Sequence, residues 1–455
     1  MGIKEEILDK IKGKKARICV VGLGYVGLPT AVFFGEQGFE VIGADVDEEK
    51  VQLIKYGKSP QPELMLENRI EKLLSSEKLH VIPDVTMAVE QSDVVLIIVP
   101  TPVNRMKKPD LSFIVSAGED TAKGLKPGKL VVLESTTFPG TCEEILQPIL
   151  EKSGLKAGED FGLAYCPERY NPGDENHTLD KVARIVGAID LEWAEITKEL
   201  YQSIVKEEVK IVKDLKTAEA AKVIENIQRD LNIALFNELA MIFQKMDIDV
   251  ISVIEAASTK WNFVRYYPGP GVGGHCLPVD PYYLTHKAME LGYHPQLILA
   301  GRSINDNMPF YVVDLIIDGL NELAKPIKGS KIAILGVAYK ANTSDIRETP
   351  AKAIVKTLLG MGANVCVHDP LVDEQEVERV FNLENCTLEE ALRNSDCVVL
   401  HTYHKTFQKL QITDLKGLMK DEALLVDTQH MFSPNDVVKS GLKYRGIGRG
   451  GIKDH

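Results

Sequence analysis

The stretch that decides the fold is Val20-Val21-Gly22-Leu23-Gly24-Tyr25-Val26-Gly27, which follows an apolar run and opens a helical segment. The first glycine permits a tight turn, the second lets the backbone approach a pyrophosphate closely, and the third allows the helix to pack near the strand. The helix N-terminus that follows would stabilise phosphate through its free N–H groups and its dipole. The pattern predicts a dinucleotide-binding turn, with a purely structural glycine turn as the alternative.

A carboxylate lies where such a turn requires one. Asp45 ends the next apolar strand, 18 residues after Gly27, and this position binds the ribose hydroxyls of a dinucleotide. Asp45 and the nearby Asp47 would repel a 2′-phosphate, and no arginine lies beside them. We therefore expect NAD rather than NADP as the cofactor.

Apolar strands alternate with helical segments in two parts of the chain. Strand-like runs occupy residues 17–21, 40–44, 94–99 and 130–134, and then residues 331–336, 364–368, 397–401 and 424–427. Such alternation is typical of parallel sheets with crossover helices. Residues 216–246 contain no glycine or proline and predict a long helix between the two parts. The fold class that follows is α/β, with two Rossmann-like doubly wound lobes joined by a long central helix.

We place the domain boundaries where these patterns change. Residues 1–210 are expected to form an NAD-binding Rossmann domain, and residues 211–325 a central helical domain that carries the long helix. Residues 326–455 are expected to form a C-terminal Rossmann-like domain. The tail from residue 444 to 455 is rich in glycine and arginine, and we expect it to be mobile.

The composition excludes several classes of protein. The 455 residues carry a net charge of −13 at pH 7, which disfavours non-specific binding to nucleic acid or to an anionic membrane. No apolar run reaches the roughly 18 residues that a membrane-spanning helix needs, and the N-terminus lacks the apolar core of a secretory signal. We therefore expect a cytoplasmic protein that has neither nucleic acid nor a membrane as partner.

The seven cysteines show no CxxC spacing, so we expect neither a disulfide framework nor a metal site. Most should be reduced and packed like small hydrophobic side chains. Cys19, Cys366 and Cys397 fit that description because they lie in strand-like runs.

Cys276 differs from the other cysteines because it lies in the glycine- and proline-rich loop Pro268-Gly269-Pro270-Gly271-Val272-Gly273-Gly274-His275-Cys276-Leu277-Pro278-Val279-Asp280-Pro281. Glycines let backbone N–H groups come close to a ligand. A thiol in such a loop, four residues before Asp280, is a candidate nucleophile. A buried cysteine beside a turn is the plain alternative.

With this loop, the chain resembles the nucleotide-sugar 6-dehydrogenases, the family that contains the UDP-glucose and GDP-mannose dehydrogenases, over nearly its whole length. The other segments that carry the resemblance are residues 21–29 with Asp45, 100–102, 135–136, 167–168, 220–222 with Asn226, and 336–340 with 345–348. Segments 167–174, 259–263 and 298–302 are similar to the branch that acts on UDP-N-acetylhexosamines. UDP-glucose dehydrogenases carry a Phe-Leu pair after the glutamate, where this chain has Arg169-Tyr170.

The resemblance implies a four-electron oxidation of the C6 alcohol of the sugar to a carboxylate, with two NAD consumed. Cys276 matches the nucleophile that holds the aldehyde as a thiohemiacetal and then as a thioester, and Asp280 matches a carboxylate that assists water or proton movement. Glu168 matches the general acid/base of thioester hydrolysis, and Thr136 matches the residue that positions the water.

Lys222 and Asn226 are spaced four residues apart on the predicted helix and share one face. The resemblance makes them the donors that stabilise negative charge on the reacting oxygen. A solvated Lys–Asn pair is the alternative, although Ala218, Ala221 and Ile224 suggest that this helix is mostly buried.

The resemblance assigns further residues to ligand binding. Those expected at the cofactor are Gly22, Gly24, Tyr25, Val26, Gly27, Asp45, Pro100, Thr101, Thr136 and Arg347. Those expected at the UDP-sugar, which the C-terminal domain would bind, are Glu168, Arg169, Lys222, Asn226, Lys260, Arg265, Gly271, Gly273 and Lys340. The chain departs from the family after Asp427-Thr428, where Gln429-His430 stands in place of a frequent arginine.

Several alternatives remain open at this point. The same chemistry could act on UDP-glucose, and among the N-acetylhexosamines the sequence does not separate the GlcNAc, GalNAc and ManNAc epimers. A two-electron hydroxyacid dehydrogenase would need neither Cys276 nor the C-terminal lobe, and a non-catalytic NAD sensor would have no use for the thiol. The resemblance also implies a homodimer or larger homo-oligomer, and a product used in polysaccharide or glycan assembly.

Overall fold

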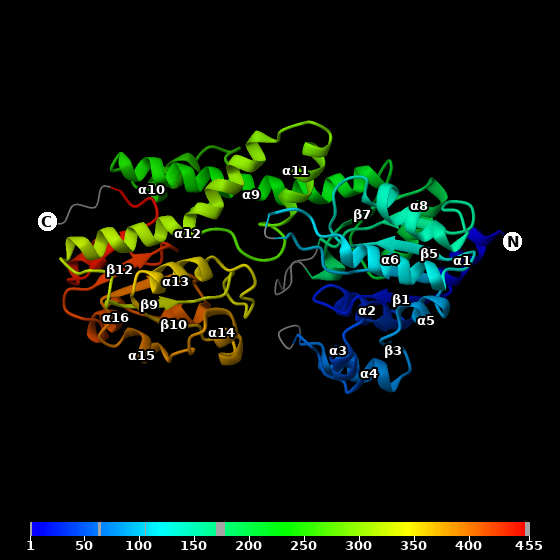
Figure 1. Cartoon of the computed structure of the whole chain (residues 1–455), viewed down its shortest axis with the longest axis horizontal. Coiled ribbons are helices and arrows are strands. Elements are labelled where there is room, and N and C mark those ends of the chain that lie inside the picture. The colour runs from blue at the N-terminus through cyan, green and yellow to red at the C-terminus, as the bar shows by residue number, and fades with distance from the viewer. Residues whose placement is uncertain (1, 62–64, 105, 170–177, 451–455) are drawn as a thin grey trace. The chain divides into compact units, whose positions relative to one another are not determined.

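The computed structural model describes residues 2–61, 65–104, 106–169 and 178–450. Two compact units make up the chain: the first is Met1–Glu225 with Tyr282–Tyr293, and the second is Asn226–Pro281 with His294–His455. The long helix α9 (Leu215–Lys245) and the helix α11 (Asp280–Glu290) each continue from one unit into the other (Figure 1). The division into three domains at residues 210 and 325 stays a prediction.

The first unit is built on an eight-stranded sheet in the order β3-β2-β1-β4-β5-β6-β7-β8. Its pairs are parallel except that β6 and β7 run antiparallel. The strands are β1 (Arg17–Val21), β2 (Glu40–Ala44), β3 (Leu79–Ile82), β4 (Val94–Ile97), β5 (Leu130–Leu133), β6 (Gly162–Tyr165), β7 (Arg184–Ala188) and β8 (Val209–Ile211).

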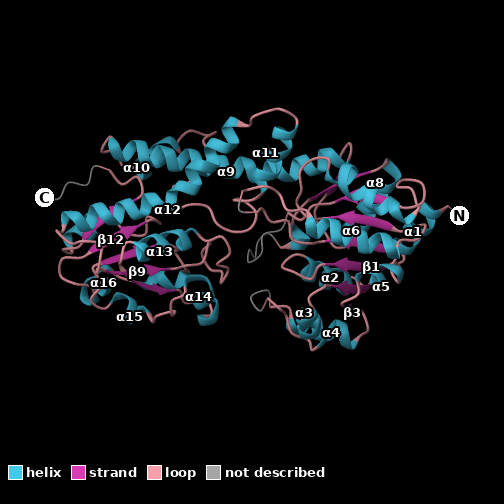
Figure 2. Cartoon of the chain, viewed as in Figure 1, coloured by secondary structure: helices cyan, strands magenta, loops and turns pink. Residues whose placement is uncertain are grey.

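Helices cover both faces of this sheet (Figure 2). They are α1 (Ile3–Lys12), α2 (Gly27–Glu36), α3 (Glu48–Lys55), α4 (Glu67–Ser75), α5 (Val85–Glu90), α6 (Ser112–Gly124), the π-helical turn η2 (Cys142–Leu146), α7 (Gln147–Leu150), the 3-10 turns η3 (Glu151–Ser153) and η4 (Leu179–Lys181), and α8 (Leu191–Gln202). Alternate residues of β1 show the division: Ile18 and Val20 pack with α1, α2 and α8, whereas Cys19 and Val21 pack with α5 and α6. Because both faces are covered, the central strands β4 and β5 are continuous apolar runs.

The second unit contains a five-stranded, all-parallel sheet in the order β10-β9-β11-β12-β13. Its strands are β9 (Lys331–Leu335), β10 (Asn364–His368), β11 (Cys397–Leu400), β12 (Leu424–Asp427) and β13 (Lys443–Gly446). Its helices are α10 (Val250–Ala257), α12 (Gln296–Glu322), α13 (Pro350–Gly360), α14 (Glu374–Phe381), α15 (Leu388–Leu392), the 3-10 turn η5 (Lys405–Lys409), α16 (Ile412–Leu418) and α17 (Pro434–Lys439). Helices α12, α13 and α14 cover one face, and α15, α16 and α17 cover the other.

A buried polar network joins α9 to α12 within the second unit. The guanidinium of Arg302 donates to Asp230 at 2.5 Å, and the amide of Asn305 donates to the same carboxylate at 2.8 Å. Asn237 in turn donates to Asn305 at 2.9 Å. Because all these groups are buried and mutually bonded, the network fixes how the two helices pack.

The predicted alternation of strands and helices, with two parallel-sheet lobes, is confirmed. Strands β1, β2, β10 and β12 have the expected bounds, and the long helix begins and ends within one residue of residues 216–246. One expectation was wrong for the part that the structure describes. Residues 444–450 are held in place, because Tyr444 and Ile447 are buried and Arg449 forms an ion pair with Asp249, and residues 451–455 lie outside the described residues. Helix α9 is mostly buried or half-buried, as expected, although Ile224 itself is 56% exposed.

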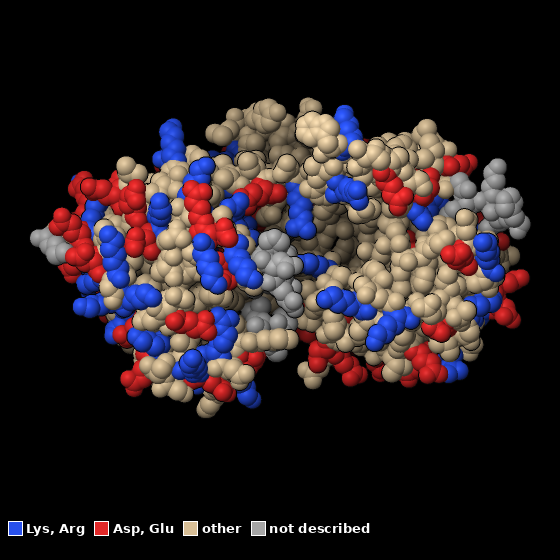
Figure 3. Space-filling view, turned by 180° about the vertical axis from the view of Figure 1, so that it is seen from behind, with Lys and Arg blue, Asp and Glu red and all other residues tan. Residues whose placement is uncertain are grey.

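The surfaces of both units mix the two signs of charge. Figure 3 shows Lys and Arg side chains interspersed with Asp and Glu side chains on the visible face of each unit. Within the residues that the structure describes, none of the helices combines the length and apolarity needed to cross a bilayer.

Candidate active site

The glycine turn in the first unit has the geometry that a dinucleotide requires. Gly22 has a φ of +95°, and a Cβ there would lie 2.2 Å from the carbonyl oxygen of Ile98, so only glycine fits. A Cβ at Gly27 would lie 1.8 Å from the carbonyl oxygen of Gly22. A Cβ at Gly24 would meet nothing within 4 Å. The protein therefore needs the first and third glycines for its own packing, and the second leaves open space where a pyrophosphate fits.

Asp45 lies at the carboxyl end of β2 and is 7% exposed. Its carboxylate accepts hydrogen bonds from the backbone N–H groups of Leu23 at 2.8 Å and Asp47 at 3.1 Å, and from the ammonium of Lys50 at 2.8 Å. These bonds fix the orientation of the carboxylate beside the glycine turn, which suits the ribose hydroxyls of NAD. Lys50 was not anticipated, and its only sequence signal is its position five residues after Asp45.

The next two strand ends lie in the same unit. Ser135, after β5, donates its Oγ–H to the carbonyl of Val99 at 2.8 Å and accepts from the N–H of Val99 at 2.9 Å. This pair of bonds locks the end of β4 to the end of β5. Pro100 is exposed, and Thr101 and Thr136 are partly exposed, so the carboxyl edge of the sheet presents them to a ligand.

Glu168 follows β6 and is 8% exposed. The guanidinium of Arg184, on β7, donates to Oε2 of Glu168, and the backbone N–H of Arg169 donates to its Oε1 at 2.6 Å. Both carboxylate oxygens are thus fixed in orientation.

Arg184 also bonds to a second buried carboxylate. Its Nη1 donates to Glu134 at 3.1 Å, and the hydroxyl of Tyr201 donates to the other oxygen of Glu134 at 2.6 Å. Burial raises the pKa of Glu134, while the charge of Arg184 opposes that rise. We call Glu134, Glu168, Arg184 and Tyr201 the buried acid cluster. Sequence analysis missed three of its four members, because they lie 16 to 67 residues from their partners and share no local pattern.

Arg169 and Lys222 lie in the first unit with Glu168. Arg169 donates to the carbonyl of Ala183 at 2.9 Å and forms an ion pair with Glu225 of α9 at 2.7 Å. Lys222, one turn before Glu225 on α9, is partly buried. The adjoining residues Tyr170–Asp174, which helped to suggest the N-acetylhexosamine branch, lie outside the described residues.

The second unit holds Cys276, Asp280 and Asn226. The side-chain amide of Asn226 donates to the carboxylate of Asp280, which is 2% exposed, and the N–H of Asp280 donates to the carbonyl of Cys276 at 2.8 Å. Asp280 opens α11, so its carboxylate also lies at a helix N-terminus. Cys276 is partly exposed, and is not enclosed in apolar packing as the alternative interpretation requires.

The glycine loop before Cys276 packs against the turn after β9. A Cβ at Gly273 would lie 2.6 Å from Cβ of Tyr339, and one at Gly274 would lie 2.8 Å from its ring. The N–H of Gly274 donates to the carbonyl of Arg347 at 3.2 Å. Burial raises the pKa of Tyr339 to about 12, and the charges of Asp345 and Cys276 add to the effect. Tyr339 was not singled out from the sequence, although it lies inside the segment 336–340.

The cations expected at the substrate are placed differently from one another. Lys340 adjoins Tyr339 and is partly exposed. Arg347 forms a forked ion pair with Asp345, with nitrogen–oxygen distances of 2.6 and 2.9 Å. Lys260 and Arg265 follow α10 and are both exposed, so a role at the substrate remains a prediction for them.

After Asp427-Thr428 this chain has Gln429-His430 where the family frequently has an arginine, so the positive charge of that arginine is absent here. His430 is partly buried in the second unit, and burial together with the charge of Arg449 lowers its pKa to about 4. It is therefore uncharged at neutral pH. The side-chain amide of Gln429 donates a hydrogen bond to the backbone carbonyl of His401 at 2.7 Å. This amide therefore satisfies a backbone acceptor of the protein itself.

Three family models match consecutive parts of the chain. They are the NAD binding domain, the central domain and the UDP binding domain of the UDP-glucose/GDP-mannose dehydrogenase family, over residues 16–205, 216–307 and 333–434. The chain is 42% identical to Protein CapL of Staphylococcus aureus, covering 94% of this chain and 99% of that protein. It is 40% identical to the UDP-N-acetyl-D-glucosamine 6-dehydrogenase of Salmonella typhi, covering 92% of this chain and 96% of that one.

Solved structures agree with the fold. The structure of a UDP-D-ManNAc dehydrogenase from Pyrococcus horikoshii superposes with a TM-score of 0.87 at 34% identity, covering 96% of this chain and all of that one. The expected fold class and the expected NAD cofactor are both confirmed by these matches. The chain belongs to the UDP-glucose/GDP-mannose dehydrogenase family and is an NAD-dependent oxidoreductase.

Proposed function

We propose that the protein oxidises C6 of a UDP-N-acetylhexosamine to the uronic acid, with UDP-N-acetylglucosamine as the preferred sugar and the ManNAc and GalNAc epimers as alternatives. The observation that carries the proposal is the partly exposed Cys276, which follows the glycine loop and lies four residues before Asp280, the hydrogen-bond partner of Asn226. Relatives named as UDP-N-acetylglucosamine and UDP-N-acetylmannosamine dehydrogenases support this choice of substrate. The product would serve polysaccharide or glycan biosynthesis.

The first half of the reaction converts the alcohol to an aldehyde. NAD, when bound, accepts a hydride in each of the two oxidations. Lys222 and Asn226 would stabilise negative charge on the reacting oxygen, and loss of one such donor typically raises the barrier by about 3 kcal/mol. The Asn226–Asp280 hydrogen bond supports this role because it holds the amide in one orientation.

The second half requires a covalent link to the chain. The Cys276 thiolate adds to the aldehyde carbon to form a thiohemiacetal, and oxidation of that adduct gives a thioester. A water positioned by Thr136 then attacks the thioester carbonyl, Glu168 accepts its proton, and the thiolate leaves. The fixed carboxylate of Glu168 supports its role as base, because a base must be held in the orientation in which it accepts the proton.

UDP-glucose is the second candidate substrate. Arg169 argues against it, since UDP-glucose dehydrogenases carry phenylalanine after the glutamate. The ion pair of Arg169 with Glu225 places a charged group next to Glu168, where an acetamido group could accept a hydrogen bond. Arg347, Lys340, Lys260 and Arg265 are proposed to contact phosphates of the cofactor or the substrate.

The assembly is proposed to be a homodimer or larger. The long helix α9 exposes Ile224, Leu235, Ile242 and the following Met246 at 46 to 59% of their surfaces, and apolar side chains in such number favour a protein–protein contact. Light scattering coupled to size-exclusion chromatography tests this, and a monomer at micromolar concentration would contradict it.

A substrate panel tests the activity. We expect two NADH per sugar with UDP-N-acetylglucosamine and a lower kcat/KM with UDP-glucose. Cys276→Ala should abolish this turnover while NAD binding persists, and Cys386→Ser, which changes another partly exposed cysteine, should not affect it. Two NADH per sugar from Cys276→Ala would refute the covalent route.

Lys222→Ala should lower kcat more than it weakens NAD binding, and an unchanged kcat would make Lys222 structural.

A further inference from the structure

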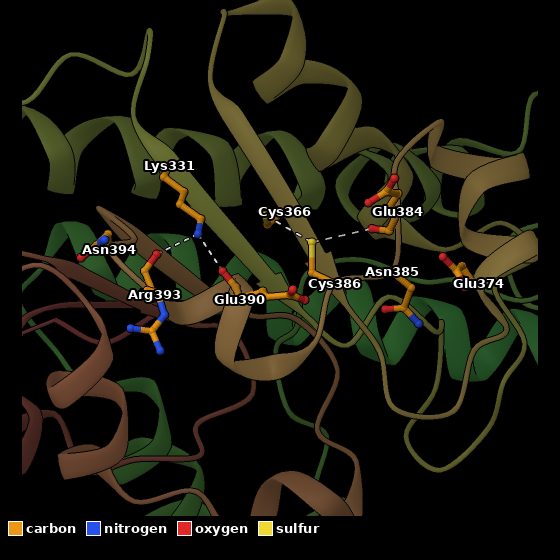
Figure 4. Close-up of a pocket in the computed structure, with 9 residues that line it drawn as sticks. All are labelled: Lys331, Cys366, Glu374, Glu384, Asn385, Cys386, Glu390, Arg393 and Asn394. Carbon is orange, nitrogen blue, oxygen red and sulfur yellow. Dashed lines mark hydrogen bonds between the residues drawn. The ribbon is translucent and has the colours of Figure 1, made fainter.

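Two cysteines of the second unit lie in contact with each other. The thiol of Cys386 donates to the sulfur of Cys366, and the two Sγ atoms are 3.3 Å apart. Figure 4 marks this contact with a dashed line from the sulfur of Cys386 toward Cys366. The pocket around the pair is lined in part by Lys331, Glu374, Glu384, Asn385, Glu390 and Arg393. Cys366 was expected to be a buried strand residue, but it is partly exposed.

The backbone on both sides holds this contact in place. Cys366 lies at the centre of β10, the edge strand of the sheet. The segment after α14 pairs with that edge through an isolated parallel bridge between Val367 and Asn385, and the N–H of Cys386 donates to the carbonyl of Val367 at 2.9 Å. The ring of His368 also bonds to the carbonyl of Cys386 at 2.8 Å. The two sulfurs meet because the main chain brings them together.

Solvent accessibility separates this pair, together with Cys276, from the four buried cysteines. Cys19, Cys142, Cys166 and Cys397 are buried, whereas Cys276, Cys366 and Cys386 are partly exposed. A small reagent can therefore reach the pair through the pocket, and among the described residues Cys276 is the other thiol that is partly exposed. The pair lies on a sheet edge that the proposed oxidation of the sugar does not use.

We propose that Cys366 and Cys386 form a reversible intramolecular disulfide by exchange with low-molecular-weight disulfides. In the first step one thiolate attacks the reagent disulfide, forms a mixed disulfide and releases one reagent thiolate. In the second step the neighbouring thiolate attacks the protein sulfur of the mixed disulfide, closes the Cys366–Cys386 bond and releases the second reagent thiolate. The two protein thiols lose two electrons and two protons, and the reagent disulfide gains the electrons.

The surroundings of the pair set the pH at which exchange becomes fast. Burial, the neighbouring Cys366 and the charge of Glu390 together raise the pKa of Cys386 to about 11, and the charge of Lys331 opposes them. The other charged groups that line the pocket are Glu374, Glu384 and Arg393. Because the thiolate is the attacking species, exchange that starts at Cys386 should accelerate about tenfold per pH unit between pH 7 and 9.

Intact-mass analysis with peptide mapping tests the proposal. The full-length protein is treated with oxidised glutathione at pH 8.5 and then alkylated. We expect a cross-linked peptide pair containing Cys366 and Cys386, a mass loss of two hydrogens for that bond, and full reversal by dithiothreitol. Cys276 is mapped separately, so an adduct on the nucleophile is not counted as the disulfide.

Two single variants make the test decisive. In Cys366→Ser, Cys386 has no neighbour to resolve the mixed disulfide, so a stable glutathione adduct should remain on it, and Cys386→Ser should show the reverse. Persistent adducts on either thiol of the unchanged protein, or no reaction at Cys366 and Cys386 while Cys276 is modified, would overturn the proposal. Since none of these readouts requires turnover, failure of the proposed sugar oxidation would leave the result unaffected.

A stability measurement checks that the bond suits the folded state. Oxidation should raise the thermal midpoint, because a cross-link between residues 366 and 386 restricts the unfolded chain, and dithiothreitol should restore the original value. Neither single variant should show the rise. A midpoint that falls on formation of the bond would contradict the inference that the main chain already holds the two residues at bonding separation.

Discussion

The two Rossmann-like lobes begin with the same turn and use it differently. In the first unit the N–H of Gly22 donates to the carbonyl of Ala44 at 2.8 Å, and in the second the N–H of Gly336 donates to that of His368 at 2.8 Å. Both glycines have positive φ, +95° and +79°. In each lobe an aspartate follows the second strand, Asp45 after β2 and Asp369 after β10.

The surroundings of the two aspartates differ. Asp369 accepts from the N–H groups of Val337 at 2.7 Å and Ala338 at 3.0 Å, and from the ring of His404 at 3.0 Å, and its side chain is fully buried. Asp45 adjoins a turn that continues through Gly24 into α2, and its neighbour Lys50 is partly exposed. One turn is open to a ligand, and the other is closed by the protein's own histidine. A shared local geometry therefore does not imply a shared ligand.

The largest expected effect separates the two glycines. Gly22→Ala should abolish measurable NAD binding and destabilise the protein by about 3 kcal/mol, from the positive φ and the clash with Ile98. Gly336→Ala is the matched variant, because its Cβ would lie 2.3 Å from the carbonyl oxygen of Thr402. It should destabilise similarly but leave NAD affinity unchanged. Calorimetric NAD titration and thermal unfolding measure both, and loss of NAD binding in Gly336→Ala would break the comparison.

Asp369→Asn should lower stability by about 3 kcal/mol, because it leaves buried partners without their anion. Burial alone would raise the pKa of Asp369, but His404 and the backbone N–H groups lower it below its ordinary value. Asp369 thus contributes stability at neutral pH that is lost as the pH falls through its ordinary value toward the lowered one. The variant should show a shallower decline of stability in acid by urea unfolding. An equally steep decline in the variant would show that protonation of Asp369 does not cause the loss of stability in acid.

Asp45→Asn should weaken NAD binding about a hundredfold, since two charge-assisted hydrogen bonds to ribose are weakened. It should also raise the ratio of NADP to NAD affinity, because the charge that repels a 2′-phosphate is gone. Asp47→Asn is the control for NAD affinity alone, because Asp47 is exposed and caps α3, and its charge also acts against a 2′-phosphate. Fluorescence titration with both cofactors measures the change, and an equal loss in the control would sink the assignment of Asp45.

Gly24→Ala should give the smallest effect and the cleanest separation of binding from folding. Its Cβ would meet nothing within 4 Å of protein, so the unfolding midpoint should not change. NAD affinity should nevertheless fall about tenfold, because the methyl group occupies space that the pyrophosphate needs. If NAD affinity is retained, the pyrophosphate does not lie over this position.

The sequence predicted what depends on local pattern. Strands such as Arg17–Val21 are uninterrupted apolar runs followed by glycine, and the glycine-free stretch of α9 has no signal that would end a helix. Strand β6 was missed because it has only four residues and begins at Gly162. Strand β8 was missed because it has only three residues, with Lys210 in the middle. The antiparallel β7 was missed because its pairing with β6 depends on distant contacts.

The site was predictable only as far as motifs reach. The turn and Asp45 were named from their spacing, and Cys276 was named as a candidate from its glycine-rich loop. The catalytic roles of Cys276, Glu168 and Lys222 were implied only by the family resemblance. Arg184 and Tyr201 could not be named, because they become relevant only when β7 and α8 place them on Glu134. His404 hydrogen-bonds to Asp369 in the second lobe, although the two residues lie 35 positions apart in the sequence. No local sequence pattern distinguishes His404 from an ordinary loop histidine.

The buried acid cluster has a consequence for how the interior handles charge. One guanidinium serves two carboxylates in a region closed to solvent, so with both ionised the cluster retains one surplus negative charge. Uptake of a single proton would make it electrically neutral. Burial raises the pKa of Glu134, which favours that proton in the interior beside the Glu168–Arg184 ion pair.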